Sequence, residues 1–273
     1  MHICSHCNIE TILFMETFSR CPICELVYYL DAQAVEYEDN YFEKEYQNQY
    51  GTNYIDDKYK IQHRMNERIK KLALYQQNLQ GKKVLELGSA AGFFLELMQK
   101  EGCEVTGWEK SSYMNLKAKE SGLNSLCGDI FTLYDEWKRK NTTGFDVVAA
   151  FYVIEHIKDQ SSLWKMLASL VNKNGYLVLA TPSLFGPMFK FFKEKWASTH
   201  PRDHFVDYSL RSLKKVARMY NFKVISTSAE GIHPHRMPLG KLWPFTFFYG
   251  ALQKKLSFSD TVFVILKYQG EIQ

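Results

Sequence analysis

Two Cys-x-x-Cys pairs near the N-terminus have the residue type and spacing of a metal site. They are Cys4 with Cys7 and Cys21 with Cys24, and residues 8–20 separate the two pairs. Four thiolates at this spacing can bind zinc tetrahedrally, and a site without an open position stabilises folding without taking part in chemistry. Two disulfides or four reduced thiols are the alternatives. The pattern therefore predicts a small zinc ribbon with a structural ion.

Residues 84–94, V-L-E-L-G-S-A-A-G-F-F, form a second pattern with chemical meaning. An apolar strand is followed by a G-x-x-x-G turn that opens a helix. Gly88 lets the backbone approach a ligand closely, and the first N–H groups of the helix attract a carboxylate. Glu86, just before the turn, can face an ammonium group. The loop predicts a site for a zwitterionic amino acid, such as the methionine part of S-adenosylmethionine (SAM).

Two further acids follow the next two apolar runs. Glu109 lies 21 residues after Gly88, close to the spacing expected for an acid that accepts ribose hydroxyls. Asp129 stands in C-G-D-I, where it can accept from an adenine amine while Ile130 packs on the ring. We expect these acids at the carboxyl ends of adjacent parallel strands, where ligands bind to open α/β sheets.

The elements that position these residues follow from the hydrophobic pattern. Runs of apolar residues, alternating with amphipathic helical stretches, occupy residues 84–87, 102–108, 124–127, 145–151 and 176–180. Such runs suit strands that are buried on both faces, so we predict a doubly wound, Rossmann-like α/β fold with a mostly parallel sheet. Two later strands, at 222–227 and 261–268, are expected to pair antiparallel at one side of it.

Four segments are predicted. They are the zinc ribbon at 1–30, a helical connector or cap at 31–80 with a helix near 61–79, the SAM-binding core at 81–183, and a substrate lid with the last strands at 184–273. The chain of 273 residues carries a formal charge of only +4, which gives no argument for nucleic acid. A secretory signal and a membrane-spanning run are both missing from the sequence, so a cytoplasmic protein is expected.

With these motifs in this order, the sequence resembles the class I SAM-dependent methyltransferase superfamily, in particular its ubiquinone-type and sugar-type small-molecule branch. The resemblance covers about residues 82–222 and includes G-Y-L-V-L-A-T-P at 175–182. It implies that the glycine loop binds the methionine part, Glu109 the ribose and Asp129 the adenine. A dinucleotide is disfavoured, because its pyrophosphate usually needs G-x-G-x-x-G. The cofactor-binding residues expected are Glu86, Gly88, Ser89, Ala90, Gly92, Glu109, Lys110, Asp129, Ile130 and Phe151.

Catalytic residues are expected in two places. Glu155 and His156 lie in F-Y-V-I-E-H-I, which resembles the V-L-E-H-I signature of ubiquinone-type O-methyltransferases. Transfer to a hydroxyl needs an oriented acceptor and a proton acceptor, and His156 is our first candidate for the base. His204, in W-A-S-T-H-P-R-D-H-F, is expected to contact the acceptor, with Arg202 near an anionic group. Alternatively His156 caps its loop, and His200 and His204 hold the lid together.

The acceptor class is predicted only broadly, as a small molecule, a sugar or a lipid-linked glycan. The chain has no N-P-P-Y segment after residue 151 and no cysteine in a nucleophile loop, which disfavours two routes to nucleobase methylation. An RNA methyltransferase and a non-catalytic SAM-binding adaptor remain alternatives, although residues 1–30 hold one Arg and no Lys. Aromatic segments at 184–196 and 242–248 can line the lid or touch a membrane surface.

Overall fold

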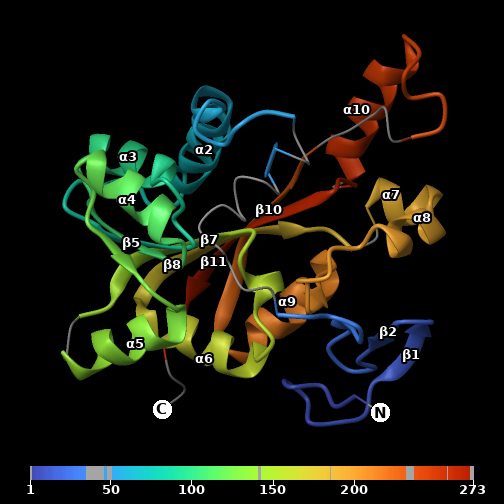
Figure 1. Ribbon diagram of the computed structural model, residues 1–273, viewed down its shortest axis with the longest axis horizontal. Coiled ribbons are helices and arrows are strands. Elements are labelled where there is room, and N and C mark those ends of the chain that lie inside the picture. Colours follow the sequence, from blue (N-terminus) through green and yellow to red (C-terminus); the bar gives the residue numbers. More distant parts are fainter. Residues whose placement is uncertain are drawn as a thin grey trace. The chain divides into compact units, whose positions relative to one another are not determined.

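The computed structural model describes residues 2–34, 46–47, 51–140, 143–184, 186–231, 237–256 and 258–270. Their strands form a four-stranded sheet of order β1-β2-β3-β9 and a seven-stranded sheet of order β10-β11-β8-β7-β4-β5-β6 (Figure 1). The chain separates into two compact units, one of residues 35–150 with 169–177 and the other of 1–34 with 151–168 and 178–273. The four segments expected from the sequence are not the same division and stay a prediction.

Parallel strands form the centre of the large sheet. β4 (Lys83–Leu87) pairs with β5 (Glu104–Glu109) on one side and with β7 (Phe145–Phe151) on the other, and β5 pairs with β6 (Ser125–Cys127). Leu87 is level with Trp108, and Glu109 is level with Cys127. The carboxyl ends of β4, β5 and β6 therefore lie side by side, as predicted for a parallel α/β sheet.

Helices follow each of these strands, and capping side chains start two of them. α3 (Phe93–Lys100) follows β4, α4 (Ser112–Glu120) follows β5, and α5 (Ile130–Arg139) follows β6. Ser111 accepts from the backbone N–H of Met114, and Asp129 accepts from that of Phe131. Each side chain satisfies an N–H that has no partner inside its helix.

One further helix precedes the sheet. α2 (Lys58–Ala73) ends earlier than the predicted helix at 61–79, and Leu74 beyond it is exposed. The chain turns back there, so that Leu79 becomes buried outside the helix. The apolar spacing of the sequence continues through the turn, which explains the overestimated length.

The last strands are antiparallel, as expected. β10 (Phe222–Glu230) pairs with β11 (Thr261–Tyr268), from Phe222 opposite Tyr268 to Glu230 opposite Thr261. The remaining helices are α6 (Gln160–Leu170), α7 (Pro187–Phe191), α8 (Lys193–Ser198), α9 (Leu210–Met219) and α10 (Phe245–Leu256). A short 3-10 helix, η1 (Ile154–His156), follows β7.

β8 (Val171–Pro182) begins five residues before the run that predicted it. A glycine after an amphipathic stretch often ends a helix, but α6 stops at Leu170 and Gly175 lies within the strand. A Cβ at Gly175 would lie 2.9 Å from the backbone oxygens of Asn172 and Asp146. Close approach of backbones, and not a helix end, is therefore the reason for this glycine.

The N-terminal strands share a sheet with a segment from the second half of the chain. β1 (Ile12–Met15), β2 (Phe18–Arg20) and β3 (Val27–Tyr29) run antiparallel in order, and β3 pairs with β9 (Val206–Asp207). Phe18 and Val27 form one apolar cluster with Leu184 and Phe189. The ribbon is thus built into the compact unit that also holds residues 178–273.

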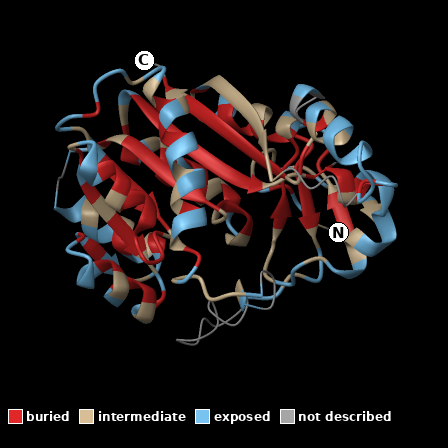
Figure 2. Cartoon of the chain, turned by 90° about the horizontal axis from the view of Figure 1, so that it is seen from above, coloured by how far each residue is buried: buried red, intermediate tan, exposed pale blue. Residues whose placement is uncertain are grey.

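Burial follows the apolar runs. Figure 2 shows the strands of the large sheet as mainly buried and exposed residues mainly on helices and loops. Cys103 is buried, whereas Cys127 is exposed although it ends an apolar run. Cys127 ends β6, the edge strand of the sheet, so one side of it has no neighbouring strand. Among the described residues no helix has both the length and the apolarity needed to cross a bilayer.

Candidate active site and cysteine cluster

The loop between β4 and α3 turns sharply. Gly88 and Gly92 have φ values of +64° and +78°, and a Cβ at Gly92 would lie 2.2 Å from Leu123 Cδ1. Ala90, between them, has φ +45° although it is not a glycine. Such backbone strain in a non-glycine residue is often found at ligand sites. The loop is therefore held in a conformation that a simple strand-to-helix turn does not need.

Glu109, at the end of β5, is bound to this loop. Its carboxylate accepts from the backbone N–H of Ala90 and from that of Ser111, both at 2.7 Å. Burial raises the pKa of Glu109, although these hydrogen bonds act in the opposite direction. The predicted ribose-binding acid thus joins the glycine loop to the start of α4.

Glu86 is buried beside the loop without full hydrogen bonding. Its side chain is 4% exposed, and Oε2 has no partner among the described residues. Burial and then the charge of Glu109 raise the pKa of Glu86 well above its usual range, and Arg68 partly offsets this. Buried polar atoms nearly always have partners, so an unpaired carboxylate oxygen here fits a missing cationic ligand. The Ser89 hydroxyl is also buried, and it too has no partner in the described part of the chain.

The other predicted cofactor residues follow the neighbouring strand ends. Asp129 is exposed and caps α5, Ile130 is buried, and Lys110 is exposed just after β5. Phe151 is buried at the end of β7 and belongs to the other compact unit. Their roles toward SAM stay predictions.

Two residues of the predicted connector were missed as site residues. The ring of Tyr54 stacks on Phe93 of α3, with centroids 5.1 Å apart and planes within 4°. Burial and then the charges of Glu86 and Glu109 raise the pKa of Tyr54. Arg68 on α2 is buried and lowers the pKa of Glu86. The abundance of Tyr before α2 was the only available signal.

In the other unit, the structure brings together Glu155, His156 and His204. One ligand atom from each lies within 4.8 Å of the others. Glu155 is 1% exposed, and its Oε2 accepts from the Thr181 hydroxyl at 3.1 Å. Its Oε1 has no partner within the described part of the chain. Burial raises the pKa of Glu155 to about 7.

Asp203 contacts the His156 ring. It was not among the predicted site residues. Nδ1 of His156 lies 3.1 Å from Asp203 Oδ2 and 3.2 Å from its backbone oxygen. Burial favours a lower pKa for His156, but Asp203 and then Glu155 outweigh it and raise the pKa. The His156 and His204 rings are perpendicular with centroids 4.6 Å apart. Burial and then the charge of His156 lower the pKa of His204 to about 3.

His200 has a different environment. Its side chain is 2% exposed, and Nε2 lies within 3.1 Å of both carboxylate oxygens of Asp207. The ring also contacts Phe18, Tyr29 and Trp196 edge-on. These contacts hold the ribbon strands against α8. Arg202 is exposed, and its backbone oxygen accepts from Gln33.

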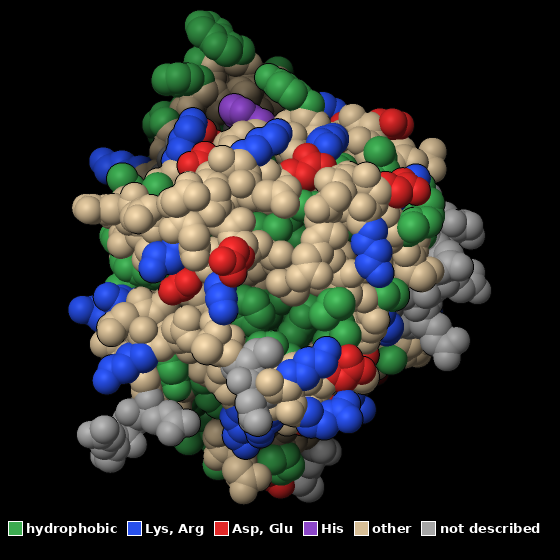
Figure 3. Space-filling model, turned by 90° about the vertical axis from the view of Figure 1, so that its left-hand side faces the viewer, with side chains coloured by type: hydrophobic (Ala, Val, Ile, Leu, Met, Phe, Trp, Pro, Cys, Tyr) green, Lys and Arg blue, Asp and Glu red, His purple; other side chains and the backbone are tan. Residues whose placement is uncertain are grey.

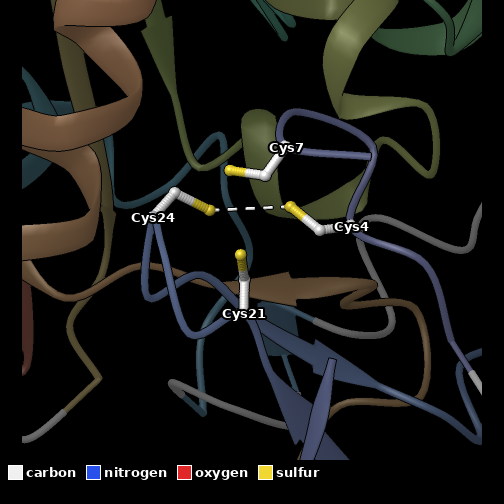
Figure 4. Close-up of side chains that lie close together, drawn as sticks. All are labelled: Cys4, Cys7, Cys21 and Cys24. Atoms are coloured by element: carbon white, nitrogen blue, oxygen red, sulfur yellow. Dashed lines mark hydrogen bonds between the residues drawn. The ribbon is translucent and has the colours of Figure 1, made fainter. Parts of the chain in front are cut away.

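The four N-terminal cysteines converge on one point (Figure 4). Their sulfur atoms all lie within 4.8 Å of one another, and Cys4 Sγ is 3.6 Å from Cys24 Sγ. None of the six cysteines is joined in a disulfide in this structure. A zinc–thiolate tetrahedron with bonds of about 2.3 Å has sulfur atoms ~3.8 Å apart, close to the distance between Cys4 and Cys24. Hydrogen bonds from Cys24 and then Tyr28 lower the pKa of Cys4 to about 4.

Comparison with known proteins gives the same fold. A family model described as "Methyltransferase domain" matches residues 58–227. The ubiquinone biosynthesis O-methyltransferase of Escherichia coli O157:H7 is 31% identical over 132 residues, which is 46% of this chain and 54% of that protein. The chain thus spans about half the length of this curated relative.

Solved structures agree at lower identity. A SAM-dependent methyltransferase from Archaeoglobus fulgidus matches with TM-score 0.58 and 16% identity, over 83% of this chain and 99% of that one. Magnesium protoporphyrin IX methyltransferase from Synechocystis PCC 6803, solved with bound SAH, matches with TM-score 0.57 and 14% identity, over 84% and 97%. Because the family match covers more than half of the chain, the protein belongs to the methyltransferase-domain family and has the class I SAM-dependent methyltransferase fold.

Proposed function

We propose that the protein transfers the methyl group of SAM to a hydroxyl of a small-molecule, sugar or glycan acceptor. The observation that carries this proposal is Glu86, whose buried and unpaired Oε2 lies just before the strained glycine turn. A buried carboxylate next to a second acid is unfavourable, and Arg68 offsets this only in part. The amino group of SAM supplies a further cation, whereas the pyrophosphate of a dinucleotide would be repelled.

The cofactor-binding residues have separate roles in this proposal. The Gly88–Gly92 turn and the start of α3 receive the carboxylate of the methionine part. Glu109 accepts the ribose hydroxyls, while Asp129 and Ile130 hold the adenine and Lys110 borders these groups. Tyr54, stacked on Phe93, covers the loop. SAM itself supplies an electrophilic methyl group, so the protein has chiefly to orient donor and acceptor.

Glu155, His156 and His204 are proposed to receive the acceptor hydroxyl. Asp203 fixes the orientation of the His156 ring at Nδ1. When Nδ1 donates to Asp203, Nε2 carries the lone pair. That lone pair can take the hydroxyl proton itself, or it can bind a cation that makes the hydroxyl more acidic.

A small acceptor is preferred over RNA on grounds of charge. On the face drawn in Figure 3, acidic side chains lie among the basic ones. Residues 1–30 hold one Arg and no Lys, so the ribbon offers few phosphate contacts. The E. coli relative is named for an O-methylation in ubiquinone biosynthesis, which also favours a hydroxyl on a small molecule.

The cysteine cluster is proposed to hold one structural zinc ion. Four thiolates in one site repel each other unless a cation balances them, and this set leaves no position open for a substrate. Tyr28 donates to Cys4 Sγ at 3.2 Å and so orients one of the four ligands.

A labelled-methyl transfer screen tests the proposed reaction. Purified protein and methyl-labelled SAM are incubated with nucleic acid, lipid, glycan and small-molecule fractions of a cell extract. We expect alkali-stable label in the glycan or small-molecule fraction, and loss of that label with the Glu109→Ala/Asp129→Ala variant. Glu104→Ala, at the exposed start of β5, is the matched control. Label in RNA would favour the nucleic-acid alternative, and no label in any fraction would favour a non-catalytic adaptor.

A further inference from the structure

We propose that Glu155, His156 and His204 form a binding site for a divalent metal ion, distinct from the cysteine cluster. One carboxylate oxygen and two imidazole nitrogens lie within 4.8 Å of one another. Two histidines with one carboxylate are a ligand set that proteins use for zinc and for iron(II), with further positions left open. Imidazole favours borderline ions of this kind over magnesium.

The unpaired oxygen of Glu155 is an independent reason to place an ion there. Thr181 holds Oε2, while Oε1 is buried without a partner among the residues described. An ionised carboxylate buried in this way carries a desolvation cost, which the hydrogen bond from Thr181 and the charge of His156 offset only in part. A divalent ion between Oε1 and the two imidazoles would offset it.

Asp203 contacts His156 in the way that a carboxylate commonly contacts a histidine that binds a metal ion. Its carboxylate is 3.1 Å from Nδ1, so in this proposal Nε2 is the atom that binds the ion. Carboxylate–histidine–metal arrangements fix the ring and its tautomer. His156 and His204 are both partly exposed, so an ion and an acceptor oxygen can reach them from solvent.

The neighbouring set of His200, His204 and Asp207 is a weaker candidate. His200 Nε2 already contacts both oxygens of Asp207, and the His200 side chain is almost fully buried. That pair is complete without an ion. His204 therefore contributes to the set that contains Glu155.

The role of the ion rests on the proposed function, although its binding does not. An acceptor hydroxyl bound to the ion has a lower pKa, so its proton leaves to water. The oxygen then forms a bond to the methyl carbon of SAM, the carbon–sulfur bond breaks, and its electron pair stays on sulfur. In this arrangement His156 is a ligand and not the free base.

Cobalt(II) binding to the full chain, with its zinc retained, tests the site. We expect about one Co²⁺ per chain by equilibrium dialysis, without the near-ultraviolet band of thiolate-to-cobalt charge transfer. Glu155→Gln and His204→Ala should each weaken Co²⁺ binding at least ~10-fold, the lower limit typical for disturbed metal sites. His63→Ala, an exposed histidine on α2, is the control. Each variant is checked for a native circular dichroism spectrum.

The outcomes separate this inference from the proposed reaction. No Co²⁺ binding, binding with a thiolate band only, or wild-type binding by Glu155→Gln would overturn the site. Binding at the site in a protein that methylates nothing would leave the site standing and refute the reaction. Full methyl transfer by Glu155→Gln in the presence of a chelator would leave the reaction standing and refute the role of the ion.

Discussion

Glu86 shows at the scale of one residue how a binding site can weaken a fold. The same burial that prepares its carboxylate for a cation raises its pKa well above the unfolded value. The folded chain therefore holds this proton more tightly than the unfolded chain does. Without SAM, the contribution of Glu86 to stability falls as pH rises from about 4.5 through its folded pKa.

Glu86→Gln is accordingly expected to stabilise the SAM-free protein at pH 8 and to weaken SAM binding. A gain of about 0.5–2 kcal/mol is usual when a strained functional group is relieved. Urea unfolding at pH 5 and pH 8 measures the gain, which should be larger at pH 8, and calorimetry measures SAM affinity. Glu104→Gln should change neither. A variant less stable than wild type at pH 8 would make Glu86 a structural residue.

Alanine substitutions of His156, His204 and His200 should differ in what they change: turnover, the acceptor KM or stability. His156→Ala is expected to lower turnover by about 10²-fold or more with nearly unchanged SAM affinity, since it acts on the acceptor oxygen either as base or as ligand. His204→Ala should raise the acceptor KM if His204 only contacts the acceptor, and should lower turnover as well if it also binds the proposed ion. His200→Ala should lower the free energy of unfolding and leave turnover of the folded fraction intact, because its contacts are internal to the ribbon side. Normal turnover of His156→Ala would reduce it to a loop residue.

The sequence predicted that Glu86, Glu109 and Asp129 lie near the carboxyl ends of neighbouring parallel strands, where the structure has them, and their roles toward SAM stay predictions. It could not locate Asp203, whose contact with His156 joins positions far apart in the chain. Tyr54 was missed for a similar reason, since the segment before α2 has no apolar period that would place it. Motif residues can be read from spacing, whereas the residues that orient them depend on the folded path.

At the scale of elements, the strands at 145–151 and 261–268 match their predicted bounds because they are apolar on both faces. α2 and β8 do not, since the apolar spacing runs past one helix end and Gly175 serves a close backbone contact. The ends of a strand that is buried on both faces can thus be predicted from the sequence, whereas an element end that a turn determines cannot.

Zinc should support the ribbon strands more than the cofactor site. Metal analysis should find about one zinc per chain, and Cys21→Ser should lower the free energy of unfolding by at least about 2 kcal/mol, a fraction of the ~10–16 kcal/mol with which zinc-finger peptides bind the ion. SAM affinity should change little. Cys127→Ser, an exposed cysteine outside the cluster, is the control. A metal-free, fully folded protein with all six thiols titratable would refute the site.

The ribbon is also tied to α9 through Glu25. Its carboxylate accepts from Arg20, Arg211 and Lys215 at 2.6–2.9 Å, and Lys215 additionally donates to the Ile23 carbonyl. Lys215→Ala should therefore destabilise by about 1.5–3 kcal/mol, since it removes charged hydrogen bonds from a buried carboxylate. Arg211 is 74% exposed, so Arg211→Ala should cost less than about 1 kcal/mol. Equal losses in urea unfolding would contradict this ranking.

At the scale of the whole molecule, the order of strands and helices can be predicted from the alternation of apolar runs with amphipathic stretches. The identity of the acceptor cannot be predicted in this way. The acceptor depends on the shapes of segments such as 184–205 and 239–256, which carry no regular alternation. Trp243 and Phe247, for example, are exposed at 84% and 77%, although aromatic residues in that run were expected mainly to line a lid. Composition alone does not decide which aromatic side chains become buried.

The two compact units carry different predicted ligands, so each ligand should protect its own unit. The residues expected to bind the methionine and ribose parts of SAM lie within 86–110, whereas the cysteine cluster and the Glu155–His204 group belong to the other unit. SAM at 100 times its Kd should add about 2.7 kcal/mol of stability. Hydrogen exchange with mass spectrometry should show SAM protecting peptides from β4, α3 and β5, while a zinc chelator should deprotect β2, β3 and α9. The Glu109→Ala/Asp129→Ala variant should lose the first effect and keep the second. SAM protection confined to residues 2–30 would contradict the assignment of the cofactor to the glycine loop.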